Sequence, residues 1–226
     1  MPTKFHEARI ARIDAAARDQ TLLSLEADPA HEATHLQVGQ YCLLRLDERN
    51  IEGHFVLIDP PGEGPFRFLL RSGGAAADAL RDAESGARVS VRGPLGKGFP
   101  IEKAHGRDVL LVSAGSGLAA IRPLLLALEP FGTRRVWLFH GTRTLDHVPF
   151  SDDLRRAQDA GLQLTVAVSG KSEAAVDRRV QHAIRRAGPD LSNAVAFVSG
   201  MQPMIDELRA ELPTLGLAAD AIYLNH

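Results

Sequence analysis

The sequence predicts a two-domain α+β fold, with an N-terminal antiparallel β-barrel over residues 1–101 and a C-terminal, doubly wound, parallel-sheet α/β domain over residues 102–226. Three observations predict it: short alternating segments in the first half, strands that alternate with helical patterns in the second half, and a glycine-rich turn where an apolar strand meets a helix. A chain of 226 residues is long enough for two domains of about 100 residues each.

The first hundred residues contain six segments of β character, separated by polar turns such as 47–50 and 59–62. Their spacing of roughly ten residues is typical of an antiparallel barrel or sandwich. An alanine-rich stretch at 75–83 predicts a short helix between the last two strands. The predicted strands are 5–13, 21–26, 40–46, 54–58, 66–71 and 88–92.

After Arg107 the pattern changes to strands followed by amphipathic helices, which predicts βαβ units and a parallel sheet. The segment 93–106, rich in Gly, Pro and Lys, is the predicted boundary between the domains. The predicted strands of this half are 109–113, 135–139, 163–168, 194–199 and 221–224, and the predicted helices are 118–128, 151–160, 173–186 and 201–212.

The junction between the strand 109–113 and the helix 118–128 is the most informative part of the chain. Gly115 and Gly117 allow the backbone to turn tightly and to expose its N–H groups. The N-terminus of the following helix adds the positive end of its dipole, so the junction is suited to binding a pyrophosphate. The same glycines also fit a tight turn that binds nothing.

Composition and charge narrow the classes of function. A net charge of −2 gives no indication of a nucleic-acid partner or of a basic membrane-binding patch. Cys42 is the only cysteine, which excludes an internal disulfide and a multi-cysteine metal site. Charged residues follow Met1 closely, and no uncharged run approaches the ~18 residues of a spanning helix. We therefore expect a soluble, cytoplasmic protein without nucleic-acid or membrane partners.

Four motifs occur in a recognisable order: Val-Gly-Gln-Tyr at 38–41, Arg-Gly-Pro-Leu-Gly at 92–96, Ala-Gly-Ser-Gly-Leu-Ala at 114–119 and Ser-Gly-Met-Gln-Pro-Met at 199–204. They resemble motifs of the ferredoxin–NADP reductase superfamily, most closely of its short flavin reductases and electron-transfer subunits. The resemblance covers nearly the whole chain. It implies an enzyme that passes hydride from NAD(P)H to a flavin, FAD or FMN, and then passes electrons to a small or protein acceptor.

The resemblance also implies where the pyridine nucleotide binds. Ser199, where the family has cysteine, becomes the catalytic residue beside the nicotinamide. Cations and hydroxyls at Ser169 and Lys171, with Arg178 and Arg179 close behind, favour NADPH, although a solvated loop fits the same residues. The implied nucleotide-binding residues are Gly115, Ser116, Gly117, Leu118, Ala119, Arg143, Ser169, Lys171, Gly200, Met201 and Met204.

The flavin motifs are weaker. The family's Arg-x-Tyr-Ser corresponds to 53–56, where Phe55 keeps the ring-stacking position beside His54. Gly53 lacks the phosphate-binding charge, and Val56, at the catalytic hydroxyl position, lacks the hydroxyl. The second flavin motif corresponds to Gly73, Gly74 and Ala75, and its hydroxyl is missing at Ala77. The missing charge could come from a neighbouring strand, through Arg67, Arg71 or Arg92, or these arginines could be solvated.

Two alternatives to a tightly bound flavin therefore remain open. In one, the chain keeps the fold without tight flavin binding and serves as a pyridine-nucleotide-binding or regulatory subunit. In the other, flavin binds loosely as a substrate. Asn225, where family members often carry a carboxylate, cannot relay a proton. Because the chain has no cysteine set for an iron–sulfur centre, one-electron transfer beyond the flavin requires a separate redox partner.

Three patterns that look catalytic are interpreted as structural. His31-Glu32-Ala33-Thr34-His35 matches the zinc-protease letters but lies in a short connection between strands, so we predict no metal site. Ser116 lacks the spacing of a nucleophile elbow. Trp137 lies within a predicted strand and is expected in the core.

Overall fold

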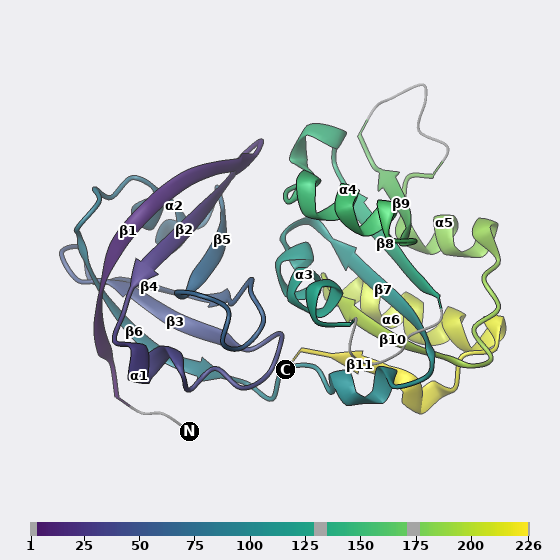
Figure 1. The fold of residues 1–226 in the computed structure, drawn as a ribbon. Helices are drawn as coiled ribbons and strands as arrows, with labels where there is room; N and C mark the ends of the chain where they lie inside the picture. The colour runs from purple at the N-terminus through teal and green to yellow at the C-terminus, as the bar shows by residue number, and fades with distance from the viewer. Residues whose placement is uncertain (1–3, 129–134, 171–176, 226) are drawn as a thin grey trace.

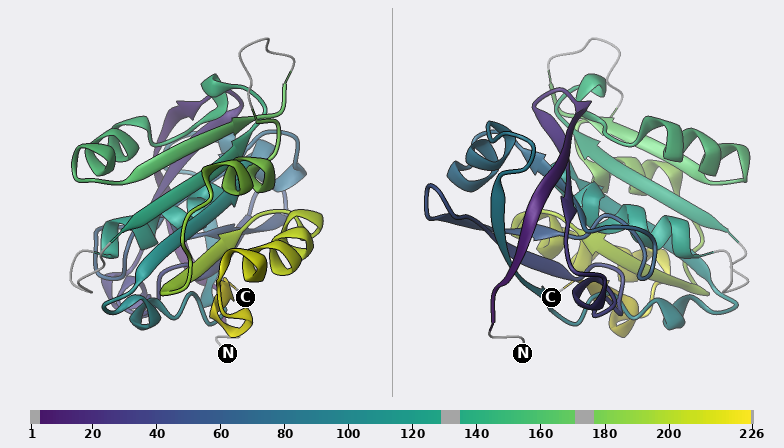
Figure 2. Two further views of the ribbon diagram at one scale, coloured as in Figure 1. Left: turned by 90° about the vertical axis from the view of Figure 1, so that its right-hand side faces the viewer. Right: turned by 60° about the vertical axis from the view of Figure 1, so that its left-hand side comes forward.

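The computed structural model describes residues 4–128, 135–170 and 177–225. An all-β domain and an α/β domain lie side by side (Figure 1). Figure 2 shows the same two domains from two further sides, with the β1–β2 hairpin running up the barrel domain. This arrangement confirms the predicted fold class.

The barrel domain is a curled, six-stranded antiparallel sheet in the order β4-β3-β6-β1-β2-β5. Leu57, directly after β4, pairs with Phe68 of β5 and so brings the two edge strands together. Inward-facing apolar residues such as Leu23, Leu44 and Phe68 are fully buried and form the core of this domain. The strands are β1 (His6–Ala17), β2 (Gln20–Glu26), β3 (Tyr41–Leu46), β4 (Ile51–Val56), β5 (Arg67–Arg71) and β6 (Arg88–Leu95).

Two short helices lie in the connections of the barrel domain. α1 (Pro29–Glu32) was not expected from the sequence, which predicts a plain connection there. It forms because Asp28 caps it, accepting a hydrogen bond from the Ala30 N–H at 2.8 Å, and because Pro29 suits the first helical position. α2 (Ala75–Arg81) begins at Gly74 without a side-chain cap. It lies close to β4.

The α/β domain has a five-stranded parallel sheet in the order β11-β10-β7-β8-β9. β7 (Asp108–Ala114) and β10 (Ala194–Ser199) are central and buried along almost their whole length, which explains their apolar sequences. The buried Asp108 at the start of β7 is paired with Arg135. The outer strands are β8 (Val136–Thr142), β9 (Gln163–Val168) and β11 (Ile222–Leu224). The order of the strands reverses between β7 and β10, where open α/β sheets bind ligands at the carboxyl ends of their strands.

Helices cover both faces of this sheet, with α3 and α4 on one face and α5 and α6 on the other (Figure 1). Within the described residues, the predicted helix 173–186 begins at Val180, because Arg179 has an extended backbone; residues 173–176 of that prediction lie outside the described residues. No helix of the described ranges has the length and apolar character needed to cross a membrane. The helices are α3 (Leu118–Ala127), α4 (Ser151–Asp159), α5 (Val180–Ala187) and α6 (Gln202–Glu211).

A buried ion-pair network joins the two domains. Arg122 of α3 donates to Asp59 of the barrel domain at 2.7 Å and to Asp153 of α4 at 2.6 Å. Arg67 of β5 pairs with the same Asp59 at 2.5 Å. The side chains of Arg122, Asp59 and Asp153 are only 11%, 8% and 12% exposed, so this network is largely shielded from solvent.

The tip of the β1–β2 hairpin makes a second contact between the domains. Arg18 pairs with Asp146 at 3.1 Å, and the side-chain amide of Gln20 donates to the carbonyl oxygen of His147 at 2.5 Å. Asp146 and His147 lie in the 3₁₀ turn Leu145–His147, a few residues after β8. The barrel domain thus holds the loop that follows β8.

Candidate functional site

A cleft of about 940 Å³ opens between the two domains at the carboxyl ends of β7, β8 and β10. The α/β domain supplies its floor, with the glycine turn Gly115–Gly117 at the centre. The barrel domain contributes Val56 and Arg71 to the opposite wall. The cleft therefore lies at the reversal of strand order and is accessible to residues of both domains.

The glycine turn is shaped by its close approach to the neighbouring strand. Gly115 has a φ of +54°, a conformation that favours glycine. A Cβ atom at Gly117 would overlap the carbonyl oxygen of Ser199 at the end of β10. Leu118 and Ala119 are buried behind the turn. The contact with β10 therefore accounts for glycine at position 117, and the turn presents its backbone to the cleft.

The turn after β10 forms one end of the cleft. A Cβ atom at Gly200 would lie 2.5 Å from Cε of Met204, so this glycine also permits close packing. Ser199 is 8% exposed and lines the cleft together with Gly200, Met201 and Met204, while Val56 lines it from the barrel domain. The structure thus brings the two predicted catalytic positions, Ser199 and Val56, to the same cleft.

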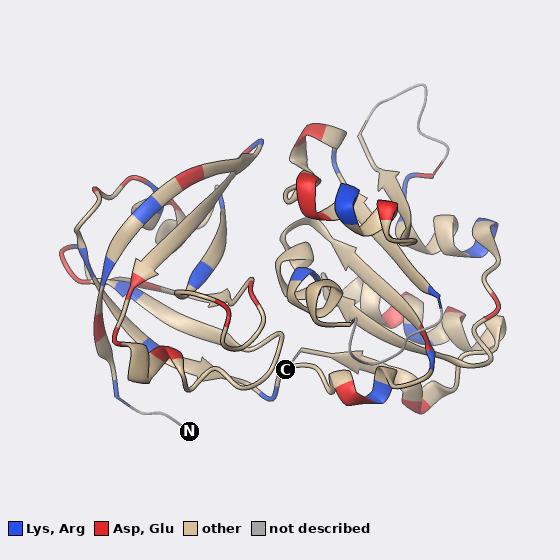
Figure 3. Cartoon of the chain, viewed as in Figure 1, with Lys and Arg blue, Asp and Glu red and all other residues tan. Residues whose placement is uncertain are grey.

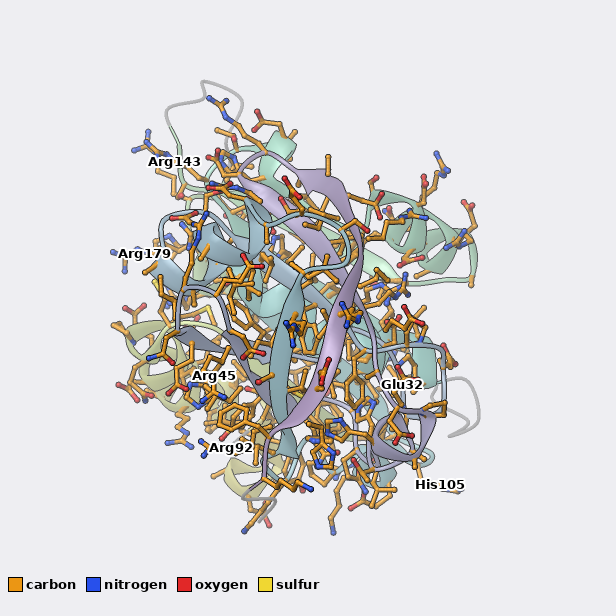
Figure 4. The ribbon with its side chains drawn as sticks, turned by 90° about the vertical axis from the view of Figure 1, so that its left-hand side faces the viewer. Glu32, Arg45, Arg92, His105, Arg143 and Arg179 are labelled. Carbon is orange, nitrogen blue, oxygen red and sulfur yellow. The ribbon has the colours of Figure 1, made fainter. Side chains whose placement is uncertain are left out.

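The other end of the cleft is rich in arginine. Arg143 follows β8, and Arg178 and Arg179 precede α5; Arg143 and Arg179 lie along the same edge of the molecule in Figure 4. Arg179 pairs with Glu207 at 3.3 Å. Within the described ranges, Arg143 and Arg178 have no carboxylate within ion-pair distance. Ser169 also lines the cleft, and its hydroxyl donates to the carbonyl oxygen of Thr142 at 3.1 Å.

The charge of the cleft differs from that of the rest of the molecule. Both signs of charge are spread over both domains in Figure 3. Among the described residues, in contrast, the cleft is lined by four arginines, Arg71, Arg143, Arg178 and Arg179, and by one carboxylate, Glu207. An anionic ligand such as a dinucleotide suits this lining. The predicted ligand Lys171 lies outside the described residues.

The structure distinguishes the three arginines that the sequence left as alternatives. Arg67 is paired with Asp59, and Arg92 lies over the ring of Phe5 with its guanidinium carbon 5.3 Å from the ring centroid. Arg71 alone lines the cleft, where one guanidinium nitrogen lies 3.8 Å from the position of a Cβ at Gly115. Arg71 therefore brings a positive charge from the barrel domain to the glycine turn.

Two cleft residues had no recognisable signal in the sequence. Gln181 of α5 donates to Glu207 of α6 at 2.8 Å, and both residues line the cleft. Each residue lies on an amphipathic helix, where a polar residue is normally expected to face solvent. Only the packing of α5 beside α6 brings them together.

The residues of the two flavin-type motifs are placed as follows. Phe55 packs against the barrel core, and His54 is exposed with its ring edge-on to Tyr41 at 5.5 Å. Gly73, Gly74 and Ala75 are exposed at the start of α2. Among the residues of these motifs, only Val56 lines the cleft.

His31, His35 and Cys42 each have a structural environment of their own. His31 bonds to the carbonyl oxygen of Gly93 at 2.6 Å and His35 to that of Gln37 at 3.0 Å, so the two rings have separate partners. No cluster of three or more metal-ligating side chains occurs among the described residues. Burial raises the pKa of the Cys42 thiol to about 12 and so keeps it protonated.

Comparison with known proteins agrees with this geometry. Residues 111–210 match the oxidoreductase NAD-binding domain. The gamma subunit of sulfhydrogenase 2 from Pyrococcus furiosus is 24% identical over 99% of this chain and 84% of the relative. The reductase component of propane 2-monooxygenase from Rhodococcus jostii is 26% identical over the whole chain, which spans only 64% of that relative. A ferredoxin NADP+ reductase from Neisseria gonorrhoeae, solved with bound FAD and NADP, superposes with a TM-score of 0.83 at 14% identity, covering 99% of this chain and 98% of that chain.

The fold of this chain is that of a ferredoxin–NADP reductase, with an antiparallel barrel domain followed by a parallel-sheet α/β domain. Residues 111–210 match the oxidoreductase NAD-binding domain, and the similar proteins include reductase components and electron-transfer subunits. The resemblance predicted from the four sequence motifs is thereby confirmed.

The residues of the barrel domain do not fit a flavin that is held through its phosphate. A Cβ atom at Gly53, the position of the family's arginine, would lie 2.7 Å from Cβ of Ala76 in α2 and 3.1 Å from Cε2 of Phe55. Gly74, at the start of α2, supplies no side-chain hydroxyl, and neither does Val56. The two regions that would have to hold a phosphate between them are therefore in contact with each other.

Proposed function

We propose that this chain is an NAD(P)H-dependent oxidoreductase that passes hydride from the nucleotide to a flavin, FAD or FMN, which enters as a dissociable substrate. From the flavin, electrons pass to a small acceptor or to a redox partner protein. The observation that carries the proposal is the cleft in which Ser199 and Val56, from different domains, line the same space beside the glycine turn.

The nucleotide is proposed to lie along the floor of the α/β domain. The nicotinamide lies beside Ser199, Gly200 and Met204, and the pyrophosphate lies on the backbone N–H groups of 115–117, where Arg71 adds a charge from above. The adenosine end is proposed to reach Arg143 and Ser169, while Lys171, the third residue predicted for this end, lies outside the described residues. Among the described residues, Arg143 and Arg178 near this end have no carboxylate partner, which supports a preference for NADPH, because a 2′-phosphate binds to cations.

Three properties of the cleft support hydride transfer. Val56 places an apolar side chain opposite the nicotinamide position, which helps to exclude water. The hydroxyl of Ser199 is held at the end of a buried strand and can donate to the carboxamide or to the reacting ring. The contact between Gly117 and Ser199 fixes the floor of the cleft. The protein thus positions the nicotinamide and flavin rings, while the cofactors carry the redox chemistry.

The test is a steady-state assay of the purified chain with NADPH or NADH and with added riboflavin, FMN or FAD. We expect NAD(P)H oxidation that depends on added flavin. Oxidation should fall at least tenfold in Arg71→Gln, because the pyrophosphate loses a charged contact. It should be unchanged in Arg92→Gln, because Arg92 lies on β6, outside the cleft lining. Absence of oxidation with every combination would overturn the proposal.

A second candidate function is that of a pyridine-nucleotide-binding or regulatory subunit without flavin chemistry. The observation that favours it is the contact between Gly53 and α2. Calorimetry distinguishes the two functions: this candidate requires NAD(P)H binding at the cleft together with no oxidation in the presence of any flavin.

A further inference from the structure

The contact between β4 and α2 closes a space that a flavin phosphate would need. We define the β4–α2 contact by Gly53, Phe55 and Ala76. Gly53 and Phe55 lie on the same side of β4 as Cys42 and Leu44, their partners on β3, which are fully buried in the barrel core. The ring of Phe55 lies over Gly53, with Cε2 and Cζ at 3.1 and 3.2 Å from the position of a Cβ there.

Ala76 closes the contact from the other side. Its Cβ lies 2.7 Å from the Cβ position at Gly53, closer than two carbon atoms normally approach. Ala76 is held in place because the neighbouring residues of α2, Ala77, Ala79 and Leu80, are buried in the barrel core. Even a methyl group at position 53 would therefore require α2 or Phe55 to move.

We propose that this chain recognises flavin through its ring system and not through its phosphate, so that it holds no resident flavin and does not discriminate between riboflavin, FMN and FAD. This inference rests on the proposed function only for the identity of the acceptor; the closure of the β4–α2 contact stands without it. Arg71, the cation that the barrel domain does place in the cleft, lies at the glycine turn and serves the nucleotide.

The first test measures the binding of riboflavin, FMN and FAD to the intact purified chain by quenching of flavin fluorescence. A charge-assisted phosphate contact would change the affinity by about tenfold or more. We expect a colourless protein and dissociation constants that agree within about threefold, a difference of less than 1 kcal/mol. A flavin that copurifies, or FMN or FAD binding at least tenfold more tightly than riboflavin, would overturn the inference.

The same measurement separates this inference from the proposed function. If the three flavins bind with similar affinity but none supports NAD(P)H oxidation, the proposed function is overturned and the inference is upheld. If no flavin binds at all, both are overturned. If FMN binds tightly and supports oxidation, the proposed function is upheld and the inference is overturned.

The second test is a double-mutant cycle. Gly53→Arg alone should lower the melting temperature without producing FMN selectivity, because Ala76 blocks the new side chain. Ala76→Gly alone should have a small effect on stability, as expected for glycine in a helix. In the double variant the arginine gains room, so we expect recovery of the melting temperature relative to Gly53→Arg, together with about tenfold tighter binding of FMN than of riboflavin.

Glu52→Arg is the control for an arginine placed one residue away on the exposed side of β4, although it changes the net charge by two units and Gly53→Arg changes it by one. It should produce no FMN selectivity, and its cost in stability should stay below about 1 kcal/mol because the new arginine lies opposite Arg45. A Gly53→Arg variant that is as stable as the parent and selects FMN would show that the contact is not closed. If Gly53→Arg does not fold, the binding series on the unaltered chain still decides the question.

Discussion

At the scale of single residues, Gly117 is set by a packing contact that the local sequence does not reveal. The sequence places it at a strand–helix junction and predicts a phosphate-binding turn, but gives no sign that Ser199 lies against it. The structure supplies that partner, because β10 runs parallel to β7 in register, with Ser199 beside Ser113. The backbone N–H groups of the turn are thus fixed by a contact that only the assembled sheet creates.

Gly117→Ala should therefore disrupt the floor of the cleft. The added methyl overlaps the carbonyl oxygen of Ser199, and we expect a loss of about 1–3 kcal/mol in the free energy of unfolding together with at least tenfold weaker NAD(P)H binding. Denaturant titration and calorimetry measure the two effects. Ser116→Ala is the control, because Ser116 is exposed in the same turn and should change stability by less than about 0.5 kcal/mol. Equal stability of both variants would contradict the expectation.

His140 should make the stability of the protein depend on pH. It is fully buried on β8, and burial lowers its pKa to about 4, below the ordinary value of 6.5. Above pH 6.5 the imidazole is neutral in both folded and unfolded chains. Between pH 6.5 and 4 only the unfolded chain binds the proton, so the free energy of unfolding should fall as the pH falls, by up to about 3 kcal/mol.

The measurement is chemical unfolding across this pH range, compared with the double variant Ser113→Ala, His140→Leu. Both partners are removed together because Ser113 Oγ lies 2.9 Å from Nδ1 of His140, and a single substitution would leave one polar group unpaired. Burial also lowers the pKa values of His31 and His35. The double variant should therefore retain part of the dependence of unfolding free energy on pH. A variant whose slope equals that of the parent would exclude His140 as its source.

At the scale of elements, α3 links the floor of the cleft to the barrel domain. Its first turn follows the glycine turn, and Arg122 on the same helix reaches Asp59 and Asp153. Arg122→Met should cost about 3 kcal/mol in the free energy of unfolding, because two buried carboxylates lose a partner; the loss stays moderate since Arg67 still pairs with Asp59.

The control for this substitution is Arg155→Ala, which breaks an ion pair on α4. Arg155 and Asp152 are 72% and 73% exposed, so their pair should contribute less than about 1 kcal/mol. Thermal or denaturant unfolding of both variants tests the difference. Similar losses of unfolding free energy in the two variants would show that the interdomain network stabilises the protein no more than an exposed ion pair does.

The sequence predicted most elements of this fold because each strand has a periodic or uniformly apolar pattern. It missed the parts that depend on pairing: β4 begins at Ile51 and not at residue 54 because Leu46 pairs with Ile51 across the hairpin. It also missed α1, whose four residues depend on one cap at Asp28. Boundaries set by a partner strand or by a single cap leave little trace in local composition.

At the scale of the whole molecule, the sequence predicted the residues on each side of the cleft separately, but not how the two sides come together. The motifs on β7 and β10 located the floor, and the motif on β4 located Val56. The positions of Arg71 and Glu207 required the packing of the two domains and of α5 against α6, which no local pattern encodes. The same packing makes the cleft strongly basic although the chain as a whole has a net charge of −2.

Nucleotide binding should stabilise the whole molecule, with NADPH acting more strongly than NADH. A ligand at about 100 times its dissociation constant adds about 2.7 kcal/mol to the free energy of unfolding. Arg178→Gln should weaken NADPH binding about tenfold and leave NADH binding nearly unchanged, because a 2′-phosphate contact is lost. Thermal shift and calorimetry measure this, with the exposed Arg209→Gln on α6, outside the cleft lining, as control. Equal weakening of both nucleotides would place Arg178 elsewhere on the ligand.

The β4–α2 contact also has an evolutionary consequence. An arginine at position 53 is disfavoured while residue 76 is alanine, and glycine at 76 weakens α2 while residue 53 is glycine. Neither single step toward a phosphate-binding barrel improves the protein, although the two together could. The present packing therefore couples the two positions, so that arginine at 53 and glycine at 76 are expected to be tolerated together more readily than either one alone.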